Sequence, residues 1–239
     1  MKPVYLLQLF FPPRCVLCGE LIKAEDEDNC FCDKCRVVWE QEKAALCPVC
    51  RRDAGHCGCE PKYNRSATVD GFRALTFYQT ENVKKLIYTL KTKGNSPLYK
   101  MISRELALAV MKYSKVDDRT VLTYPERSRA SVKKYGVDQA KTVCRAVSKL
   151  TGIPCAPFIK HKSGAEQKKL SAKERGENAA ASYTINQKRK DEIKGRHIIF
   201  IDDVVTTGAT SVVCAALCKA EGAKSFTVYS VAKTPDLKG

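Results

Sequence analysis

The chain contains 239 residues, of which 44% are hydrophobic and 28% are charged, and its mean hydropathy is −0.31. These values are typical of a globular protein with a sizeable core, built as one large domain or as a medium domain plus a small one. No apolar run approaches the roughly 20 residues that a membrane-spanning helix needs, so we expect no membrane span.

The first segment, residues 4–11, is apolar but short, carries Gln8 and is followed by Pro12-Pro13-Arg14. It lacks the small-residue cleavage site of a signal peptide, and we predict a short helix that docks elsewhere in the protein. Without an export signal, the chain is expected in the cytoplasm, where thiols stay reduced and paired cysteines indicate bound metal.

Nine of the 13 cysteines fall within residues 15–59, mostly as Cys-x-x-Cys pairs. Such a turn presents two thiolates to one metal ion, and two turns complete a tetrahedral Cys₄ site. We predict one or two structural zinc ions, with sequential pairing as the simplest arrangement. An interleaved pairing stays open, and so do Cys30 and His56 as replacements for Cys32 and Cys57. The predicted ligands are Cys15, Cys18, Cys32 and Cys35 for one ion, and Cys47, Cys50, Cys57 and Cys59 for the other.

The distribution of charged residues changes along the chain at the same place as the distribution of cysteines. Residues 1–66 contain 10 basic and 10 acidic residues, whereas residues 67–239 contain 32 and 16. We therefore expect a zinc-ribbon domain over 1–66, including the apolar start, and a larger domain over 67–239. Within the larger domain, residues 127–196 hold 18 basic and 6 acidic residues, which favours a phosphate-bearing partner such as single-stranded DNA. A solvated basic surface without a partner is the alternative.

After residue 67, short apolar strands alternate with amphipathic helices. This alternation is typical of an α/β fold with a mostly parallel sheet and helices on both faces. In chain order we predict a strand over 72–78, helices over 83–90 and 98–111, a strand over 120–124, a helix over 138–150, a strand over 198–201, a helix over 210–220 and a strand over 226–231. The cysteines outside the paired region, Cys144, Cys155, Cys214 and Cys218, are expected in the core.

The strongest functional signal follows the strand over 198–201, where Asp202 and Asp203 precede a turn rich in Thr and Gly and the start of a helix. Backbone N–H groups at a helix N-terminus bind phosphate, and Gly208 allows the backbone to approach it closely. We expect both acids at the mouth of the site rather than inside the sheet, holding ribose hydroxyls and a Mg²⁺ ion. No Gly-Lys-Ser/Thr follows, which excludes a Walker A loop. The predicted binding residues are Asp202, Asp203, Val204, Thr206, Thr207, Gly208, Ala209 and Thr210.

This segment resembles the signature with which type I phosphoribosyltransferases bind 5-phosphoribosyl-1-diphosphate (PRPP). In that signature the acids contact the ribose hydroxyls and the turn holds the 5-phosphate. With the cysteine-rich start, the order of segments resembles the ComF family, which is associated in bacteria with DNA uptake during natural transformation. The resemblance implies a type I phosphoribosyltransferase-like fold, PRPP or ribose 5-phosphate as ligand, and competence (DNA-uptake) proteins as partners. Residues 10–19 and 86–91, and Gln167, Leu170, Arg175 and Asn178, carry it.

The sequence departs from this family pattern in two places. Tyr135-Gly-Val-Asp-Gln139 stands where Arg-Gly-Phe-Asn-Gln is expected, and Lys160 stands where an Arg is expected. Lys does not reproduce the bidentate hydrogen bonds of Arg to phosphate, so we expect an altered pyrophosphate end of the site. That end is assigned by position to the loop after the strand over 120–124, and a Lys-rich segment over 163–175 is either a lid or a plain surface loop. The predicted pyrophosphate-side residues are Pro125, Arg127 and Lys134.

Three functions remain open from the sequence. The first is a DNA-uptake protein that binds ribose phosphate with Mg²⁺ and handles single-stranded DNA. The second is an active phosphoribosyltransferase of nucleotide metabolism, in which positioning and electrostatics do the catalysis. The third is a PRPP-sensing regulator without catalysis. The residues identify no acceptor substrate.

Overall fold

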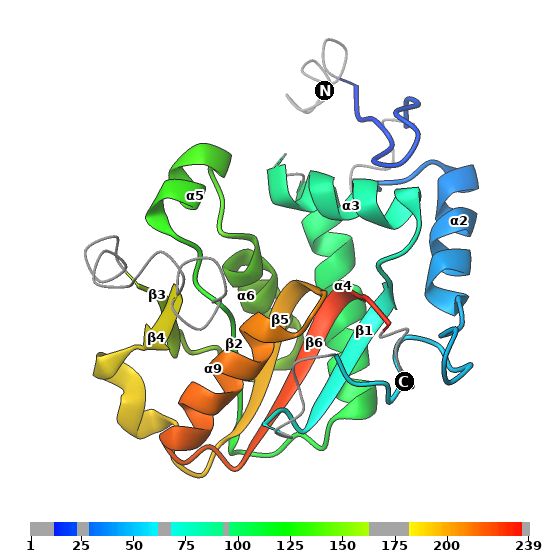
Figure 1. The fold of residues 1–239 in the computed structure, drawn as a ribbon. Helices are drawn as coiled ribbons and strands as arrows, with labels where there is room; N and C mark the ends of the chain where they lie inside the picture. The colour runs from blue at the N-terminus through cyan, green and yellow to red at the C-terminus, as the bar shows by residue number, and fades with distance from the viewer. Residues whose placement is uncertain (1–11, 23–28, 62–67, 93–95, 163–181, 236–239) are drawn as a thin grey trace, which may run out of the picture.

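A four-stranded parallel sheet forms the centre of the fold (Figure 1). The computed structural model describes residues 12–22, 29–61, 68–92, 96–162 and 182–235. Parallel neighbours need crossover connections, which the intervening helices provide. From edge to edge the strands are β1 (Gly71–Phe77), β6 (Ser225–Lys233), β5 (His197–Val205) and β2 (Thr120–Thr123).

Helices cover both faces of this sheet. In Figure 1, α9 lies in front of the strands, α4 and α6 lie behind them, and α3 lies above their carboxyl ends. Among the described residues, no helix is both long and apolar enough to cross a bilayer. The helices are α2 (Asp33–Ala44), α3 (Glu81–Thr92), α4 (Ser96–Tyr113), α5 (Arg129–Tyr135), α6 (Gln139–Thr151) and α9 (Ala209–Ala220).

The central strands are buried on both faces. In β5, Ile199 and Ile201 belong to the core that includes α4 and α6, whereas Ile198 and Phe200 belong to the core that includes α9. Successive side chains of a strand point to opposite faces, so a strand covered on both sides needs a continuous apolar run. This explains why residues 198–201 are all apolar and confirms the α/β class expected from the sequence.

A second, smaller sheet stands beside α9. It pairs β3 (Ile159–His161) with β4 (Tyr183–Ile185) in antiparallel fashion, and a 3₁₀ helix, Gln187–Glu192, follows. These strands are absent from the sequence prediction because three residues are too few to show a period. The sequence prediction also lacks α5, although Ser128 caps this helix by accepting the N–H of Ser131 at 3.1 Å.

The cysteine-rich part packs on the larger part through a shared core. Trp39 of α2 is 2% exposed, and its Nε1 donates to the carboxylate of Glu105 on α4 at 3.0 Å. The same carboxylate accepts from Lys43 at 2.8 Å, and Lys85 of α3 donates to the carbonyl of Leu17. The expected domain boundary at residue 66 and the expected docking helix over 4–11 lie outside the described residues, and the division into 1–66 and 67–239 stays a prediction.

Two expectations from the sequence are wrong. β5 continues to Val205, so Asp202 and Asp203 lie within the strand and not beyond it. The reason is that β6 runs on to Lys233 and offers pairing partners along the whole of this stretch. Cys155, expected in the core, is half-buried, with its Sγ 3.3 Å from that of the buried Cys144.

Candidate functional site

The turn between β5 and α9 leaves the N-terminus of a helix open to a ligand. Thr206 and Thr207 are exposed, and Gly208 adopts the left-handed conformation at φ +79° before α9 begins at Ala209. The first backbone bond that follows runs from the N–H of Val212 to the carbonyl of Gly208 at 2.9 Å. Of the N–H groups that precede this bond, that of Ala209 donates to Oγ1 of Thr207 at 3.4 Å, and those of Thr210 and Ser211, together with the helix dipole, favour an anion.

Two half-buried acids stand next to this turn. The backbone N–H of Asp203 donates to Oδ1 of Asp202 at 2.8 Å, and Oδ1 of Asp203 pairs with Nζ of Lys91 at 3.1 Å. Burial raises the pKa of Asp202 to about 7, and the neighbouring Asp203 charge adds to the rise, against the opposing charges of Lys91 and Arg127. Two carboxylates this close repel each other, so the site is suited to a cation or to hydroxyl donors.

Lys91 reaches the acids from the end of α3, and Gln139 holds that end in place. Gln139 is 2% exposed at the start of α6, and its Nε2 donates to the carbonyl of Lys91 at 2.6 Å. From the sequence, both residues stand out only as parts of a family pattern, and Lys91 has no assigned role. The sequence signal that could have indicated a role for Lys91 is the pair Leu90-Lys91, because it places a cation at the end of an amphipathic helix.

The loop after β2 is tied to the same region by Asp138. One carboxylate oxygen caps α6 by accepting the N–H of Lys141 at 3.1 Å, and the other accepts the N–H of Arg127 at 3.1 Å. The guanidinium of Arg127 lies 5.2 Å from the centre of the Tyr135 ring. Its Nη1 is buried and has no hydrogen-bond partner among the described residues. Tyr135 and Asp138, which depart from the family pattern, thus position Arg127 beside the site.

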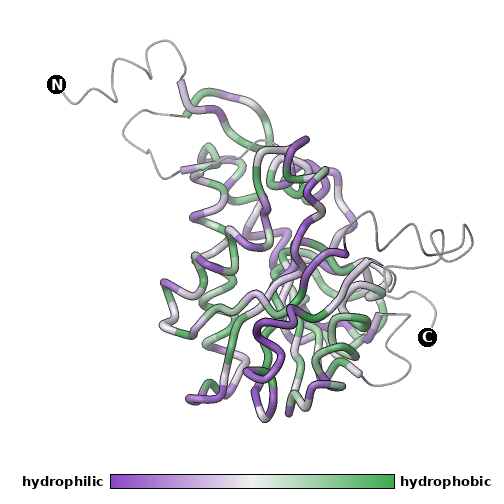
Figure 2. Tube along the Cα trace, turned by 90° about the vertical axis from the view of Figure 1, so that its left-hand side faces the viewer, coloured by the Kyte–Doolittle hydropathy of each residue, from purple (hydrophilic) through white to green (hydrophobic). Residues whose placement is uncertain are grey.

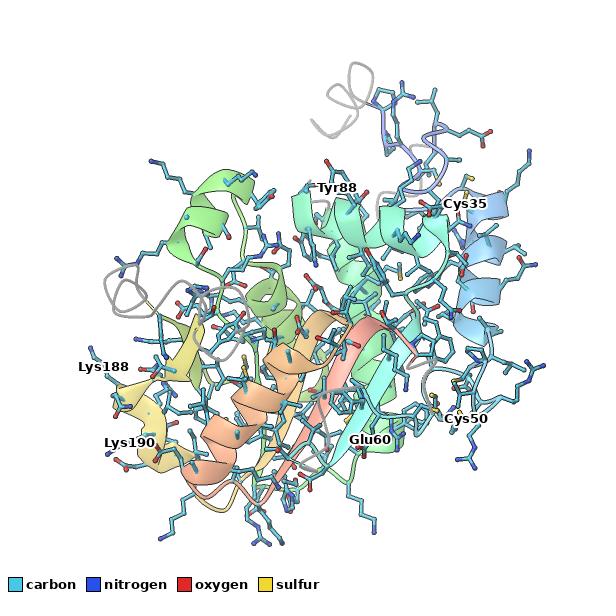
Figure 3. The ribbon with its side chains drawn as sticks, in the orientation of Figure 1. Cys35, Cys50, Glu60, Tyr88, Lys188 and Lys190 are labelled. Carbon is cyan, nitrogen blue, oxygen red and sulfur yellow. The ribbon has the colours of Figure 1, made fainter. Side chains whose placement is uncertain are left out.

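A basic cavity of about 940 Å³ opens between this loop and the β3–β4 sheet. One acid, Glu126, lines it against five Lys and Arg side chains. Figure 2 turns this side toward the viewer and shows hydrophilic stretches running down it, and Figure 3 shows Lys188 and Lys190 pointing outward. Its basic lining residues are Arg127, Arg129, Lys160, Lys162 and Lys188, together with His161.

The structure brings most of the predicted site residues to one edge of the sheet. The segment Asp202–Thr210 contains the two acids and the turn that follows them. Pro125 is buried and forms a β-bridge with Ile159 of β3. Lys134 is exposed on α5, where its Nζ lies 5.1 Å from the Tyr135 ring centre, and it does not line the cavity. The expected lid over 163–175, and Gln167 to Asn178, lie outside the described residues.

The eight predicted metal ligands gather into two clusters in the sequential order. Within each cluster all four Sγ atoms lie within 4.8 Å of one another. Figure 3 shows Cys35 and Cys50 well apart, at opposite ends of the cysteine-rich part. Cluster 1 is Cys15, Cys18, Cys32 and Cys35, and cluster 2 is Cys47, Cys50, Cys57 and Cys59.

The sulfur spacing fits zinc. Four thiolates about 2.3 Å from a tetrahedral ion lie about 3.8 Å from one another. The Sγ atoms of Cys18 and Cys32 are 3.6 Å apart, and those of Cys47 and Cys59 are 3.9 Å apart. The two spare ligands are not used: Cys30 is buried outside cluster 1, and His56 pairs instead with Asp53 at 2.8 Å. Both clusters are compatible with structural zinc.

Curated relatives match most of the chain, although no family model matches it. The DNA utilization protein YhgH of Escherichia coli K12 is 27% identical over 221 residues, which cover 85% of this chain and 90% of the relative. The competence protein ComFC of Streptococcus pneumoniae is 22% identical over 232 residues, covering 92% and 100%. The competence protein F of Haemophilus influenzae is 26% identical over 231 residues, covering 86% and 97%.

Solved structures match a smaller part. The glutamine PRPP amidotransferase of B. subtilis has a TM-score of 0.39 at 17% identity, covering 56% of this chain and 26% of that one. This chain thus spans about a quarter of the amidotransferase. A hypoxanthine-guanine-xanthine phosphoribosyltransferase has a TM-score of 0.34 at 16% identity, covering 55% and 62%.

The similarity to the competence and DNA utilization proteins extends over more than four fifths of the chain. At the cysteine-rich start, the structure forms two Cys₄ clusters ahead of a parallel α/β sheet. The chain is therefore a homologue of the competence and DNA utilization proteins.

Proposed function

We propose that the chain binds PRPP or ribose 5-phosphate together with Mg²⁺ at Asp202–Thr210, and that it acts in DNA uptake by handling single-stranded DNA. The observation that carries the first part is the juxtaposition of two acids with an open helix N-terminus. A ribose phosphate offers hydroxyl donors to the acids and an anion to the N–H groups of residues 207–210.

Asp202 and Asp203 supply the carboxylate oxygens that Mg²⁺ prefers. Bound there, the ion would neutralise two acids that otherwise repel each other and the ligand's phosphates. Asp203 already has Lys91 as a counter-charge at 3.1 Å, whereas no cation of the described residues forms an ion pair of that length with Asp202. Asp202 is thus the acid whose ionisation depends most on what binds.

The DNA-handling part of the proposal rests on the basic cavity and on the named relatives. The cavity lies beside the acids, since Arg127 both lines it and acts electrostatically on Asp202. Single-stranded DNA presents a row of phosphates that such a groove neutralises without base preference. The relatives are named for competence and DNA utilization, which favours DNA over a small acidic metabolite as the occupant.

An active phosphoribosyltransferase is the second candidate, favoured by the same turn and acids. Titration calorimetry with PRPP and Mg²⁺ tests binding, and a pyrophosphate assay on the same preparation tests transfer. We expect saturable PRPP binding and no pyrophosphate release in the presence of free purine or pyrimidine bases. Release that depends on one base would make the chain an enzyme, and the absence of any PRPP binding would refute the site assignment.

A further inference from the structure

The turn that is proposed to hold the ribose phosphate is fixed at both ends by residues connected to cluster 2. At its first end, Val205 pairs with Lys233 across the sheet, and the N–H of Thr234 donates to the Val205 carbonyl at 2.8 Å. At its other end, the buried Pro61 lies against Gly208. Pro61 follows the last ligand of cluster 2, Cys59, by two residues.

The contact between Pro61 and Gly208 is close. A Cβ placed on Gly208 would lie 2.7 Å from Cβ and 3.2 Å from Cγ of Pro61. Gly208 is therefore required twice, once for its left-handed φ of +79° and once because the proline ring occupies the space of a side chain. A shift of Pro61 would change what the turn packs against.

Lys233 connects the other end of the turn to the cluster itself. Its side chain is 1% exposed, its Nζ donates to the carbonyl of Cys57 at 2.8 Å, and the same atom lies 6.0 Å from the centre of the Phe77 ring. No carboxylate pairs with Lys233 within the described part of the chain. A buried ammonium needs an anionic partner.

Cluster 2 supplies that partner when metal is bound. Four thiolates around Zn²⁺ carry a net charge of about −2, and the carbonyl that accepts from Lys233 belongs to Cys57, one of these ligands. Without the ion, metal coordination no longer holds Cys57, so its carbonyl loses the fixed position at which it accepts from Lys233. Phe77 and Cys57 share one small core with Cys47, so displacement of the cluster would reach the end of the sheet.

We propose that Lys233 and Pro61 are positioning residues through which metal at cluster 2 fixes the shape of the ribose-phosphate turn. The ligand part of this inference rests on the proposed function, whereas the structural part does not. Cluster 1 lies at the other end of the cysteine-rich part (Figure 3) and makes no such contact among the described residues. The two metal sites therefore differ in role, and only cluster 2 controls the turn.

Hydrogen exchange of the full-length, zinc-loaded protein tests the coupling without any ligand, and it is read at the N–H groups of Val212 and Thr234, which bond to the carbonyls of Gly208 and Val205 at the two ends of the turn. Cys59→Ser removes one partly exposed ligand of cluster 2, and Cys18→Ser is the matched change in cluster 1. We expect exchange in the turn to accelerate by roughly 5- to 150-fold in Cys59→Ser and to stay unchanged in Cys18→Ser. Lys233→Met keeps every cysteine and should also accelerate it, while Lys233→Arg, which retains the charge, should restore slow exchange.

Equal exchange of the turn in the two cysteine variants, or an unchanged turn in Lys233→Met, would overturn the proposal. Zinc content and thermal unfolding of each variant separate a local effect from loss of the whole fold. A PRPP titration of the same proteins separates this inference from the proposed function. If wild type does not bind PRPP but the turn loosens as expected, the coupling stands and the ligand assignment fails. If wild type and Cys59→Ser bind PRPP equally and exchange equally, the coupling fails.

Discussion

At the scale of single residues, Asp202 carries the most information about the site. It lies inside β5 opposite Ser230, half-buried, with Asp203 beside it and Lys91 engaged by Asp203. The sequence indicated both acids, because two aspartates directly after an apolar run have no role in packing. It did not pair Asp203 with Lys91, because that contact depends on how α3 crosses the carboxyl ends of the strands.

The raised pKa of Asp202 predicts a pH-dependent cost to stability. In the folded protein Asp202 keeps its proton up to a pKa of about 7, whereas in the unfolded chain it loses it near 3.9. Between these values the folded state binds more protons, so the free energy of unfolding falls as pH rises and levels off above about 7. Asp202→Asn does not titrate, and in the absence of Mg²⁺ it should be more stable than wild type at pH 8 by on the order of 1–4 kcal/mol.

Urea unfolding at pH 5 and at pH 8 measures this difference. The gain from Asp202→Asn should be much smaller at pH 5, since wild-type Asp202 is then mostly protonated. Asp118→Asn, an exposed acid at the opposite end of β2, is the control and should show no comparable gain at either pH. A gain from Asp202→Asn that is the same at both pH values would contradict the environment that the structure gives Asp202.

The acids also predict the affinity for PRPP. Changing Asp202 and Asp203 to Ala should remove their bonds to the ribose hydroxyls and to Mg²⁺, at a cost of roughly 1.5–3 kcal/mol for each charged hydrogen bond removed. That corresponds to about a tenfold to over a hundredfold weaker binding for each acid. Titration calorimetry with Mg²⁺ and PRPP, with Asp118→Ala as control, measures it. Equal affinity for the double variant and wild type would place the ligand elsewhere.

At the scale of elements, the sequence predicted the larger strands and helices of the sheet and missed the parts that enclose the site. The strand over 198–201 and the helix over 138–150 follow from apolar runs and caps, and the structure has both. The cavity, by contrast, is closed by β3, β4 and α5, of three, three and seven residues. Elements this short are formed by tertiary contacts and show no periodicity.

The walls of the cavity predict how single-stranded DNA binds. Binding should weaken by orders of magnitude between about 50 and 200 mM salt if several phosphates are neutralised. Lys160→Ala combined with Lys188→Ala removes one cation from β3 and one from the 3₁₀ helix. The salt slope should then fall by about 0.7 for each phosphate that the double variant no longer neutralises.

The matched control is Lys34→Ala with Lys115→Ala, which removes two exposed cations that do not line the cavity. Fluorescence anisotropy with a labelled oligothymidine over a range of salt concentrations gives both slopes. The control pair should leave the slope close to that of wild type. Equal slopes for both pairs, or binding that does not respond to salt, would show that the cavity is not where DNA is held.

At the scale of the whole molecule, the two parts predicted from charge and cysteines are less separate than the sequence indicates. Three apolar residues of the cysteine-rich part share one core with α3 and α4, namely Val16, Leu17 and Trp39. A composition shift reveals where side chains of one kind are concentrated along the chain, but it does not reveal which surfaces become buried against each other. Zinc in this protein is therefore expected to support the core of the larger part as well as the ribbon.

The two Cys₄ clusters predict two zinc ions per chain, measured by elemental analysis of the purified protein. Cys15→Ser should remove the ion of cluster 1, because a hydroxyl in place of the buried thiolate does not close the tetrahedron. Metal binding at such a site contributes to the free energy of folding, and Cys15 also belongs to the core shared with α3 and α4, so this variant should unfold at a lower temperature.

Cys30→Ser is the informative comparison, since Cys30 is equally buried but lies outside the cluster, and it should retain both ions. A stoichiometry near one would restrict zinc to a single cluster, and one near zero would mean that thiols alone hold the ribbon together. Loss of metal in Cys30→Ser but not in Cys15→Ser would exchange their roles and contradict the ligand set.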